Sequence, residues 1–296
     1  MGALIIGTGI STDKTEKSSI QHAVIAAKEC MAKAKVLAED VDFIINTGIY
    51  REKNIFEPAV ALLIQKELGM NGDYVKANNG KDAIGFDLMN GGIGALNAFK
   101  IADSLLQSGA VRHVLIIGGE AHPSGKDVSG FPYTTLGSAI LLAKNVDAKR
   151  GFQGFDFRSR QIEGQGRIGF LDMTNVGPNG RDSMTIKTHP GYIPAAKALA
   201  TELAKEFISK NKIKTEGLHL IASQLDESFG KEIAKGLDVA PEFALNLFKD
   251  FGDVNSATFG LGFNQLQKLK KRDAGTEVLF LGAAAGIDSG VAHYIC

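Results

Sequence analysis

The sequence predicts an α/β fold built from parallel βαβ units. Short apolar runs alternate along the chain with longer segments whose apolar residues recur three and four positions apart. The chain has 296 residues, of which 44% are hydrophobic, so it can form one large or two medium domains with substantial cores. The length excludes a single small module, and the alternation argues against a β-sandwich or a helical bundle.

Each expected element follows from this periodicity. The strands are apolar runs bounded by turn residues, and we expect them at 3–6, 43–46, 86–89, 114–118, 139–142, 218–222 and 278–281. The helices are the amphipathic stretches between them, at 21–36, 58–68, 93–107, 193–209, 231–237, 241–249 and 259–271.

A stretch rich in Gly, Asn and Asp, residues 164–182, interrupts this alternation. We therefore place the boundary between two halves there, giving 1–165 and 166–296. Each half is expected to run strand, helix, strand, helix, and then strand, small-residue turn and helix.

Composition narrows the classes of function. Thirty-three basic residues balance thirty-three acidic ones at a pI near 7.0, which leaves no basic field for nucleic acid or an anionic membrane. The N-terminus lacks the basic flank and long apolar region of a signal peptide, and no apolar run is long enough to cross a bilayer, so we expect a cytoplasmic protein. The two cysteines, Cys30 and Cys296, indicate neither a disulfide framework nor a metal site. No cofactor is expected.

One segment suggests acyl-transfer chemistry. Residues 86–96 run from a strand through a turn of small residues into an amphipathic helix that closes at Ser108-Gly109, where Gly is the favoured C-cap. Such a turn presents a side chain at a helix N-terminus. The helix dipole and free N–H groups there lower the pKa of a thiol, which is why nucleophiles occur at these elbows.

The surrounding pattern resembles ketoacyl-ACP synthase III of the thiolase superfamily. The similarity rests on Phe86-Asp87, Gly94 and Ser108-Gly109, and it extends to further segments in family order: 39–45, 112–120, 134–142, 252–258 and 281–286. The resemblance implies a thiolase-like five-layer αβαβα fold with two pseudo-duplicated halves. It also implies an acyltransferase ancestry in fatty acid biosynthesis and an acyl-CoA or other acyl-thioester ligand.

The family's Cys-His-Asn triad is replaced at every position. Anchored on its neighbours, the nucleophilic Cys falls on Gly92, the His of a His-Gln-Ala-Asn motif on Ser223, and the Asn of a Gly-Asn-Thr-Ser turn on Asp253. The resemblance therefore implies a pseudoenzyme that does not condense acyl groups by the family mechanism. The backbone N–H groups around Gly92 and Ala285 could still form an oxyanion hole.

Two further departures concern ligands. The family's Trp-bearing segment, which helps to hold the coenzyme A nucleotide, has no counterpart between Thr8 and Gln21, and the chain contains no Trp. The family's Arg for carrier-protein docking is matched by Ser228.

We expect a non-condensing partner subunit, in a homodimer or in a heterodimer with an active ketosynthase III paralogue, paired through an edge strand at 83–89. The alternatives are an acyltransferase or ketosynthase with a non-standard site, or an acyl-ligand binding protein.

Several residues keep more than one interpretation. Gly92 is either the relic of a lost nucleophile or a residue that tolerates an unusual backbone angle. Ser223 is either a new nucleophile or, more commonly, a hydrogen-bonded pocket serine. Asp253 is a new acid or base, or a turn-capping carboxylate. His122 lies near the pocket mouth or, more often for its type, in a surface loop, and Gly7-Thr8-Gly9 is a weak dinucleotide fingerprint.

Overall fold

The computed structural model describes residues 2–70, 82–161, 166–172, 184–269, 271 and 273–296. Within them the strands and helices follow in the order β1 (Leu4–Ser11), α1 (Ser19–Ala34), β2 (Phe43–Asn46), α2 (Val60–Glu67), β3 (Ile84–Asp87), α3 (Gly94–Ser108), β4 (His113–Glu120), β5 (Leu136–Ala143), β6 (Gly151–Ser159), β7 (Arg167–Phe170), β8 (Thr185–Thr188), α4 (Tyr192–Asn211), β9 (His219–Ala222), α5 (Phe229–Gly236), β10 (Ala244–Leu245), α6 (Phe248–Phe251), α7 (Thr258–Lys268), β11 (Glu277–Ala284) and β12 (Asp288–Ile295).

The strands form two five-stranded mixed sheets. Sheet A has the order β1-β5-β4-β2-β3, and sheet B has the order β6-β12-β11-β9-β10. In each sheet the first three strands are antiparallel and the last three are parallel. The two sheets therefore repeat one plan, as the resemblance to thiolases implied.

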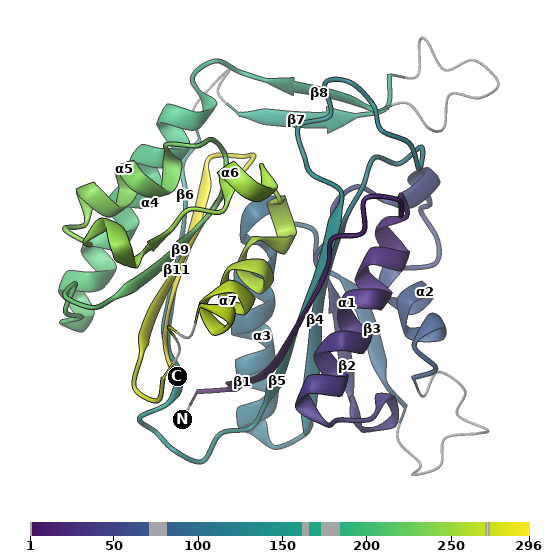
Figure 1. Cartoon of the computed structure of the whole chain (residues 1–296), viewed down its shortest axis with the longest axis horizontal. Coiled ribbons are helices and arrows are strands. Elements are labelled where there is room, and N and C mark those ends of the chain that lie inside the picture. Colours follow the sequence, from purple (N-terminus) through teal and green to yellow (C-terminus); the bar gives the residue numbers. More distant parts are fainter. Residues whose placement is uncertain (1, 71–81, 162–165, 173–183, 270, 272) are drawn as a thin grey trace.

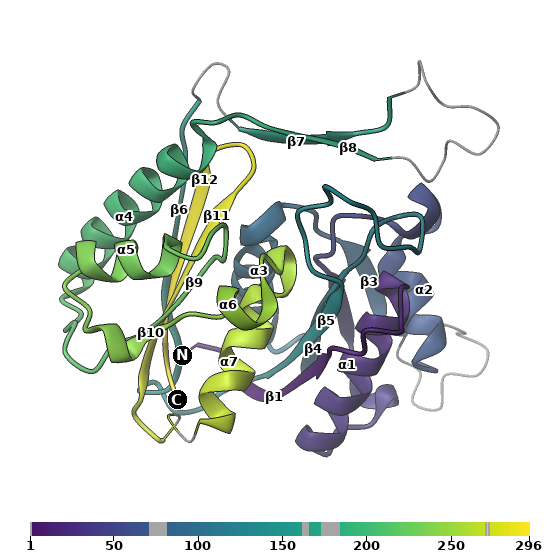
Figure 2. The same ribbon diagram turned by 45° about the horizontal axis from the view of Figure 1, so that its top comes forward.

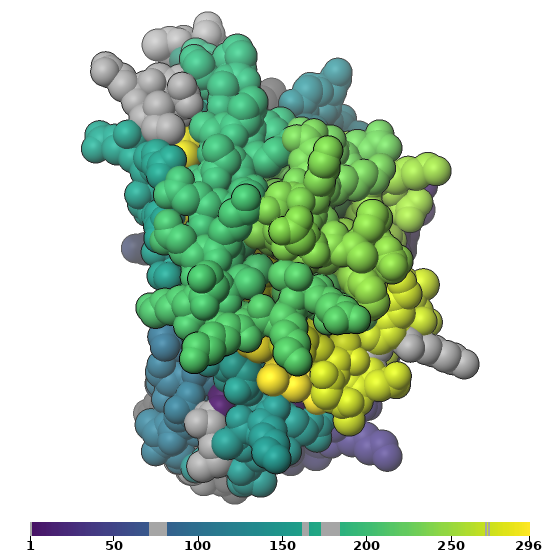
Figure 3. Space-filling model, turned by 90° about the vertical axis from the view of Figure 1, so that its left-hand side faces the viewer, coloured from purple at the N-terminus to yellow at the C-terminus, as the bar shows by residue number. Residues whose placement is uncertain are grey.

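Five layers result from this plan (Figure 1). Helices α1 and α2 cover the outer face of sheet A, α3 and α7 lie between the sheets, and α4 and α5 cover the outer face of sheet B. Figure 3 shows α4 and α5 spread over that outer face. The thiolase-like fold expected from the resemblance is confirmed.

The core sits mainly between the sheets. Phe99 of α3 packs on Phe152 and Phe280 from sheet B, with ring centroids 5.0 Å and 5.7 Å apart, and all three side chains are buried. Burial of a side chain of this size stabilises a fold by about 1.5–3 kcal/mol. The contacts link the first half of the chain to the second, so the halves form one packed unit.

The glycines of β1 belong to this packing. A Cβ on Gly9 would lie 1.9 Å from the carbonyl oxygen of Ala26, and one on Gly7 would lie 2.7 Å from that of Cys30. Both glycines let α1 approach the strand closely, and β1 continues through them to Ser11. The weak dinucleotide fingerprint is thus a packing feature.

The expected helices and strands differ from the structure in two respects. The expected helix at 241–249 is wrong: Pro241 begins a short 3-10 helix, β10 pairs in parallel with β9, and α6 follows. Strands β6, β7, β8, β10 and β12 were not expected from the local patterns; of these, β6 pairs with β12, a strand far along the chain. The division into 1–165 and 166–296 stays a prediction; β6 falls in the first of these ranges and pairs with β12 in sheet B.

The hairpin of β7 and β8 stands outside both sheets. Figure 2 shows it lying across the end of the molecule, from the side of sheet B toward the side of sheet A. The stretch 164–182, where the halves were expected to meet, lies largely outside the described residues.

Candidate functional site

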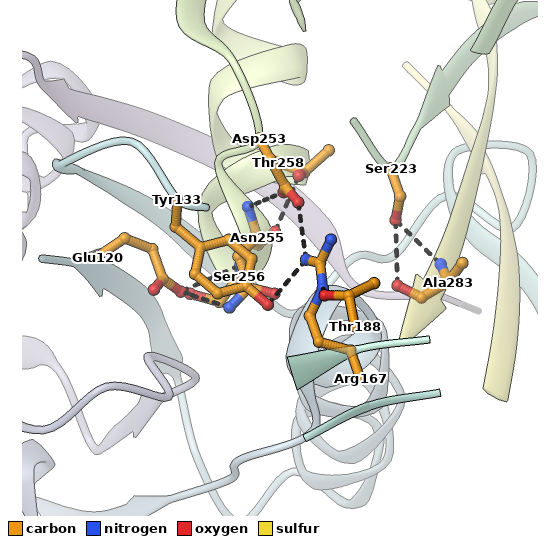
Figure 4. Close-up of polar contacts among 10 residues, drawn as sticks. All are labelled: Glu120, Tyr133, Arg167, Thr188, Ser223, Asp253, Asn255, Ser256, Thr258 and Ala283. Atoms are coloured by element: carbon orange, nitrogen blue, oxygen red, sulfur yellow. Dashed lines mark hydrogen bonds and ion pairs between the residues drawn. The ribbon is translucent and has the colours of Figure 1, made fainter. Parts of the chain in front are cut away.

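The candidate site forms where the carboxyl ends of the parallel strands of both sheets face one another. The turn after β3 carries Gly91 and Gly92, β4 ends in Glu120, Ser223 follows β9, and Ala285 follows β11. Crevices beyond the carboxyl ends of parallel strands are the usual binding positions in α/β proteins. Figure 4 shows the polar residues gathered there.

The elbow at Gly92 has no room for a side chain. Gly92 is buried, and a Cβ built on it would lie 2.4 Å from the carbonyl oxygen of Ala283 and 3.1 Å from Ser223 Oγ. Real Cβ atoms do not approach a backbone atom so closely. The left-handed backbone angle falls on the preceding residue, Gly91, at φ +46°. Gly92 is therefore required for close approach between β11 and the elbow, and not for an unusual φ.

Ser223 is tied to the neighbouring strand. Its Oγ accepts a hydrogen bond of 2.9 Å from the Ala283 backbone N–H and lies 3.5 Å from the Ala283 carbonyl oxygen. The described residues place no carboxylate or imidazole within hydrogen-bond reach of this hydroxyl. The geometry is that of a hydrogen-bonded pocket serine.

Asp253 has two partners and serves both as a turn cap and in an ion pair. Its Oδ1 accepts from the backbone N–H of Asn255 at 3.0 Å, and its Oδ2 lies 3.2 Å from Arg167 Nη1. Both charged side chains are buried. Burial raises the pKa of the Asp253 carboxyl to about 6, although Arg167 opposes that shift.

Arg167 reaches this site from the β7–β8 hairpin. Its Nε donates to Thr188 Oγ1 at 3.0 Å, and its Nη1 donates to the Tyr133 hydroxyl at 3.0 Å as well as to Asp253. The guanidinium lies over the rings of Tyr133 and Tyr192, at 5.3 Å and 5.0 Å from their centroids. Such contacts hold a cation in one orientation.

Glu120 is the most buried acid of the site. Its Oε1 accepts from Ser256 Oγ at 2.5 Å, from the Ser256 backbone N–H at 3.2 Å, and from Asn255 Nδ2 at 3.1 Å. Its Oε2 has no hydrogen-bond partner among the described residues. Burial raises the pKa of this carboxyl to about 8, so Glu120 is mainly protonated at neutral pH.

A small cavity of about 140 Å³ lies among these groups. Its walls are the elbow glycines, Ala283, Ala285, Arg167, Asn255 and a set of apolar and aromatic side chains, Ile49, Tyr50, Tyr133, Tyr192 and Leu225. Gly92 and Ala285, the expected oxyanion pair, both line it. Ser223 and Asp253 lie just behind the wall.

The structure also shows the surroundings of His122, Ser228 and the two cysteines. His122 is only 5% exposed, so the expectation of a surface loop histidine is wrong; its ring packs 5.0 Å from Phe131, which in turn contacts the cavity wall at Tyr50. Ser228 donates to Asp226 Oδ1 and lies 3.1 Å from Lys197 Nζ. Cys30 and Cys296 are buried away from the elbow, and burial raises the pKa of the Cys30 thiol to about 12.

Sequence reasoning missed Arg167 and Glu120. Glu120 had a signal, because it ends a strand at the same edge as the elbow. Arg167 had no such signal in the sequence, since it lies in a glycine-rich stretch and reaches the site only through the hairpin.

Within the described part of the chain, no group of three or more His, Cys, Asp or Glu side chains is placed to hold a metal ion, and no helix is long and apolar enough to span a bilayer.

Comparisons with known proteins agree with this fold. No protein-family model matches the chain. The chain is 26% identical over 294 residues to beta-ketoacyl-[acyl-carrier-protein] synthase III of Granulibacter bethesdensis, covering 94% of this chain and 84% of that protein. It is 23% identical over 281 residues to the corresponding Aquifex aeolicus protein, covering 93% and 83%.

Solved structures show the same architecture. The crystal structure of 3-oxoacyl-[acyl-carrier-protein] synthase III from Aquifex aeolicus matches over the whole of both chains with a TM-score of 0.81 at 19% identity. Xanthomonas campestris OleA, solved as a variant with bound lauric acid and lauroyl-CoA, matches over 100% of this chain and 99% of its own with a TM-score of 0.83 at 16% identity.

The fold and the comparisons together place this chain in the class of proteins with the thiolase-like condensing-enzyme fold. Within that class, the sequence is similar over 93–94% of its length to beta-ketoacyl-[acyl-carrier-protein] synthase III proteins.

Proposed function

We propose that this protein does not condense acyl groups and acts as a partner subunit of a ketosynthase III paralogue that keeps its cysteine. The observation that carries the proposal is the closed elbow. At the position matched to the family nucleophile, Gly92 offers no reacting group, and the Ala283 carbonyl oxygen, 2.4 Å from a built Cβ, occupies the space a side chain would need.

The other two matched positions support the same conclusion. Ser223 is held by the backbone of Ala283, and Asp253 is held by Arg167 and the turn at Asn255. A serine without an adjacent base is a weak nucleophile. An acyltransferase that uses a non-standard site would need such a base, and the described residues do not supply one at Ser223.

The edge of sheet A supports a protein partner. β3 is the terminal strand of that sheet, and apolar side chains are exposed beside it: Ile84 is 54% exposed and Met89 51%. Leu62 of α2, which packs on β3, is 43% exposed. An unpaired apolar edge is an aggregation hazard unless another chain covers it. A homodimer or a heterodimer through β3 would remove that hazard.

Incubation with acetyl-CoA, lauroyl-CoA and acyl carrier protein thioesters, followed by intact-mass measurement, tests the catalytic half of the proposal. We expect the mass to remain unchanged. A stable acyl adduct on a pocket residue would contradict it.

The proposed role as a partner subunit needs a separate test. Affinity capture from the native host should recover a ketosynthase III paralogue bearing Cys, His and Asn, and capture should fail for an Ile84→Lys variant. Capture of no such paralogue would refute the heterodimer.

A binding role is the second candidate, because a cavity of about 140 Å³ lies beside the elbow. An acyl-ligand binding protein needs only a lined pocket, and the relatives' structure with lauric acid and lauroyl-CoA shows that the fold accommodates such ligands in OleA.

A further inference from the structure

A second hollow lies at the opposite end of sheet B from the elbow. Strand β9 begins at His219 and leads to Ser223 of the candidate site, and β11 begins at Glu277 and reaches Ala283 beside the elbow. The hollow has a volume of about 540 Å³, and its walls come from the first residues of β9 and β11 and from the segments that precede β9, β10 and β11. In Figure 1 this is the end of sheet B where the C-terminus lies, away from the β7–β8 hairpin. Small-molecule sites have volumes of roughly 300–1,000 Å³.

His219 is a buried imidazole that opens on this hollow. Only 6% of the residue is exposed, and its ring packs edge-to-face on Phe243 with the centroids 5.0 Å apart. No described residue forms a hydrogen bond with its ring nitrogens, and neither nitrogen is sealed in the interior. Burial, with a smaller effect of Lys271, lowers the pKa of His219, so at neutral pH one ring nitrogen is an acceptor. A nearly buried polar group without a protein partner favours a ligand that supplies one.

The neighbouring His293 shows the kind of partner that His219 lacks. His293 Nε2 lies 2.8 Å from Glu277 Oε2, so a carboxylate of the same wall completes its hydrogen bonding. Three more carboxylates line the hollow, and none of them forms a hydrogen bond with His219 or an ion pair with a described residue. They belong to Glu216, Glu242 and Asp273. The space between the imidazole and these carboxylates is therefore left for another molecule.

The wall of the hollow is acidic. Four of the described residues that line it are acidic and one, Lys271, is basic. Lys271 Nζ donates to the backbone carbonyl oxygen of Glu242 at 3.1 Å and forms no ion pair with the described carboxylates. Complementary charge across a binding surface therefore favours a cationic ligand.

The spacing of the carboxylates selects an elongated cation. Among the described residues, no three His, Cys, Asp or Glu side chains converge on one point as a metal ion would require. Carboxylates that surround a hollow without converging match a ligand whose positive charges are spaced along a stem. Phe243 adds an aromatic wall, which attracts ammonium groups and packs against methylene groups.

We propose that this hollow binds an aliphatic polyamine, with one ammonium group donating to His219 and the others paired with the carboxylates of the wall. Phe243 contacts the methylene stem. The hollow lies at the other end of β9 from the elbow, so the inference goes beyond the proposed function and does not depend on it. No covalent bond forms or breaks.

Isothermal titration of the full chain with spermidine, and with hexanediol as an uncharged chain, tests the inference. Wild-type protein should bind spermidine and not hexanediol. Raising the salt from about 20 mM to about 200 mM should weaken spermidine binding, because salt screens exposed ion pairs. Glu242→Gln and Asp273→Asn should each weaken it about two- to five-fold, the range for an exposed ion pair. Glu67→Gln, at an exposed position on α2, is the matched control and should leave the affinity unchanged.

Two further variants test the direction of the electrostatics and the role of the imidazole. Lys271→Gln removes the one described cation of the wall and should tighten spermidine binding about two- to five-fold. An anionic ligand would reverse the signs at Lys271 and Glu242. His219→Leu removes the acceptor and should weaken spermidine binding about ten- to a hundred-fold, as for loss of a hydrogen bond to a charged group.

Absence of spermidine binding at low salt would overturn the inference. Unchanged affinity in a combined Glu242→Gln and Asp273→Asn variant would also overturn it, and so would weaker binding in Lys271→Gln. If His219→Leu does not fold, the two exposed carboxylate variants decide. A capped trilysine peptide that binds more tightly than spermidine would overturn the assignment to a free polyamine and indicate a lysine-bearing protein partner.

Discussion

Replacement of Glu120 by glutamine should change how stability depends on pH. In the folded protein burial raises the pKa of this carboxyl from 4.5 to about 8, whereas the unfolded chain has the ordinary value. Between these two pH values the folded state keeps a proton that the unfolded state has released. Stability therefore falls as pH rises, by about 1.4 kcal/mol per pH unit in this window. The contribution is fully present below pH 4.5 and is lost as pH rises toward 8.

Glutamine preserves the contacts and removes the titration. Its Oε1 can still accept from Ser256 and Asn255, as the protonated acid does. The variant should match wild type near pH 5 and be more stable at pH 8, by an amount on the order of 4 kcal/mol. Urea unfolding followed by circular dichroism at pH 5, 6, 7 and 8 measures the difference, with a constant m-value as the check on two-state behaviour.

The reasoning would be refuted by parallel stability curves for the two proteins. Asp253, whose raised pKa adds a slope of the same sign at lower pH, is present in both and largely cancels in the comparison. Glu216→Gln, at an exposed position, serves as the matched control and should leave the pH profile unchanged.

Two further predictions concern the elbow and the sheet edge. Gly92→Ala should lower the free energy of unfolding, measured in urea, by about 1–3 kcal/mol, because its Cβ would overlap the Ala283 carbonyl oxygen. The control Gly154→Ala, whose Cβ would meet only Phe207 at 3.4 Å, should lower it less. Equal effects of the two substitutions would mean that the elbow is not closed. Ile84→Lys should convert a dimer to a monomer in light scattering, while Val146→Lys, at a loop residue that is 84% exposed, should not. A wild-type monomer at micromolar concentration would contradict the proposed pairing through β3.

Local sequence patterns located much of the architecture. Helices α1, α3, α4 and α7 begin or end within a few residues of their expected bounds, because each is amphipathic and has a clear start or stop, such as the Ser18 N-cap or the C-cap at Gly109. The elbow was also located, since a strand, a small-residue turn and a helix are neighbours in the chain. Local patterns failed for β6, where pairing with the distant strand β12 overrides local preference, and for the two-residue strand β10.

What the sequence by itself determined is the layered α/β plan and the absence of a side chain at Gly92. Only the tertiary structure decided which groups surround the position of the missing side chain. The closure of the elbow depends on Ala283, from a strand almost two hundred residues away, and the charge of the pocket depends on Arg167, carried in by a hairpin without any local signal. Both are contacts between segments far apart in the chain, one made by strand β11 of sheet B and one by the β7–β8 hairpin, and no pattern of neighbouring residues encodes such contacts.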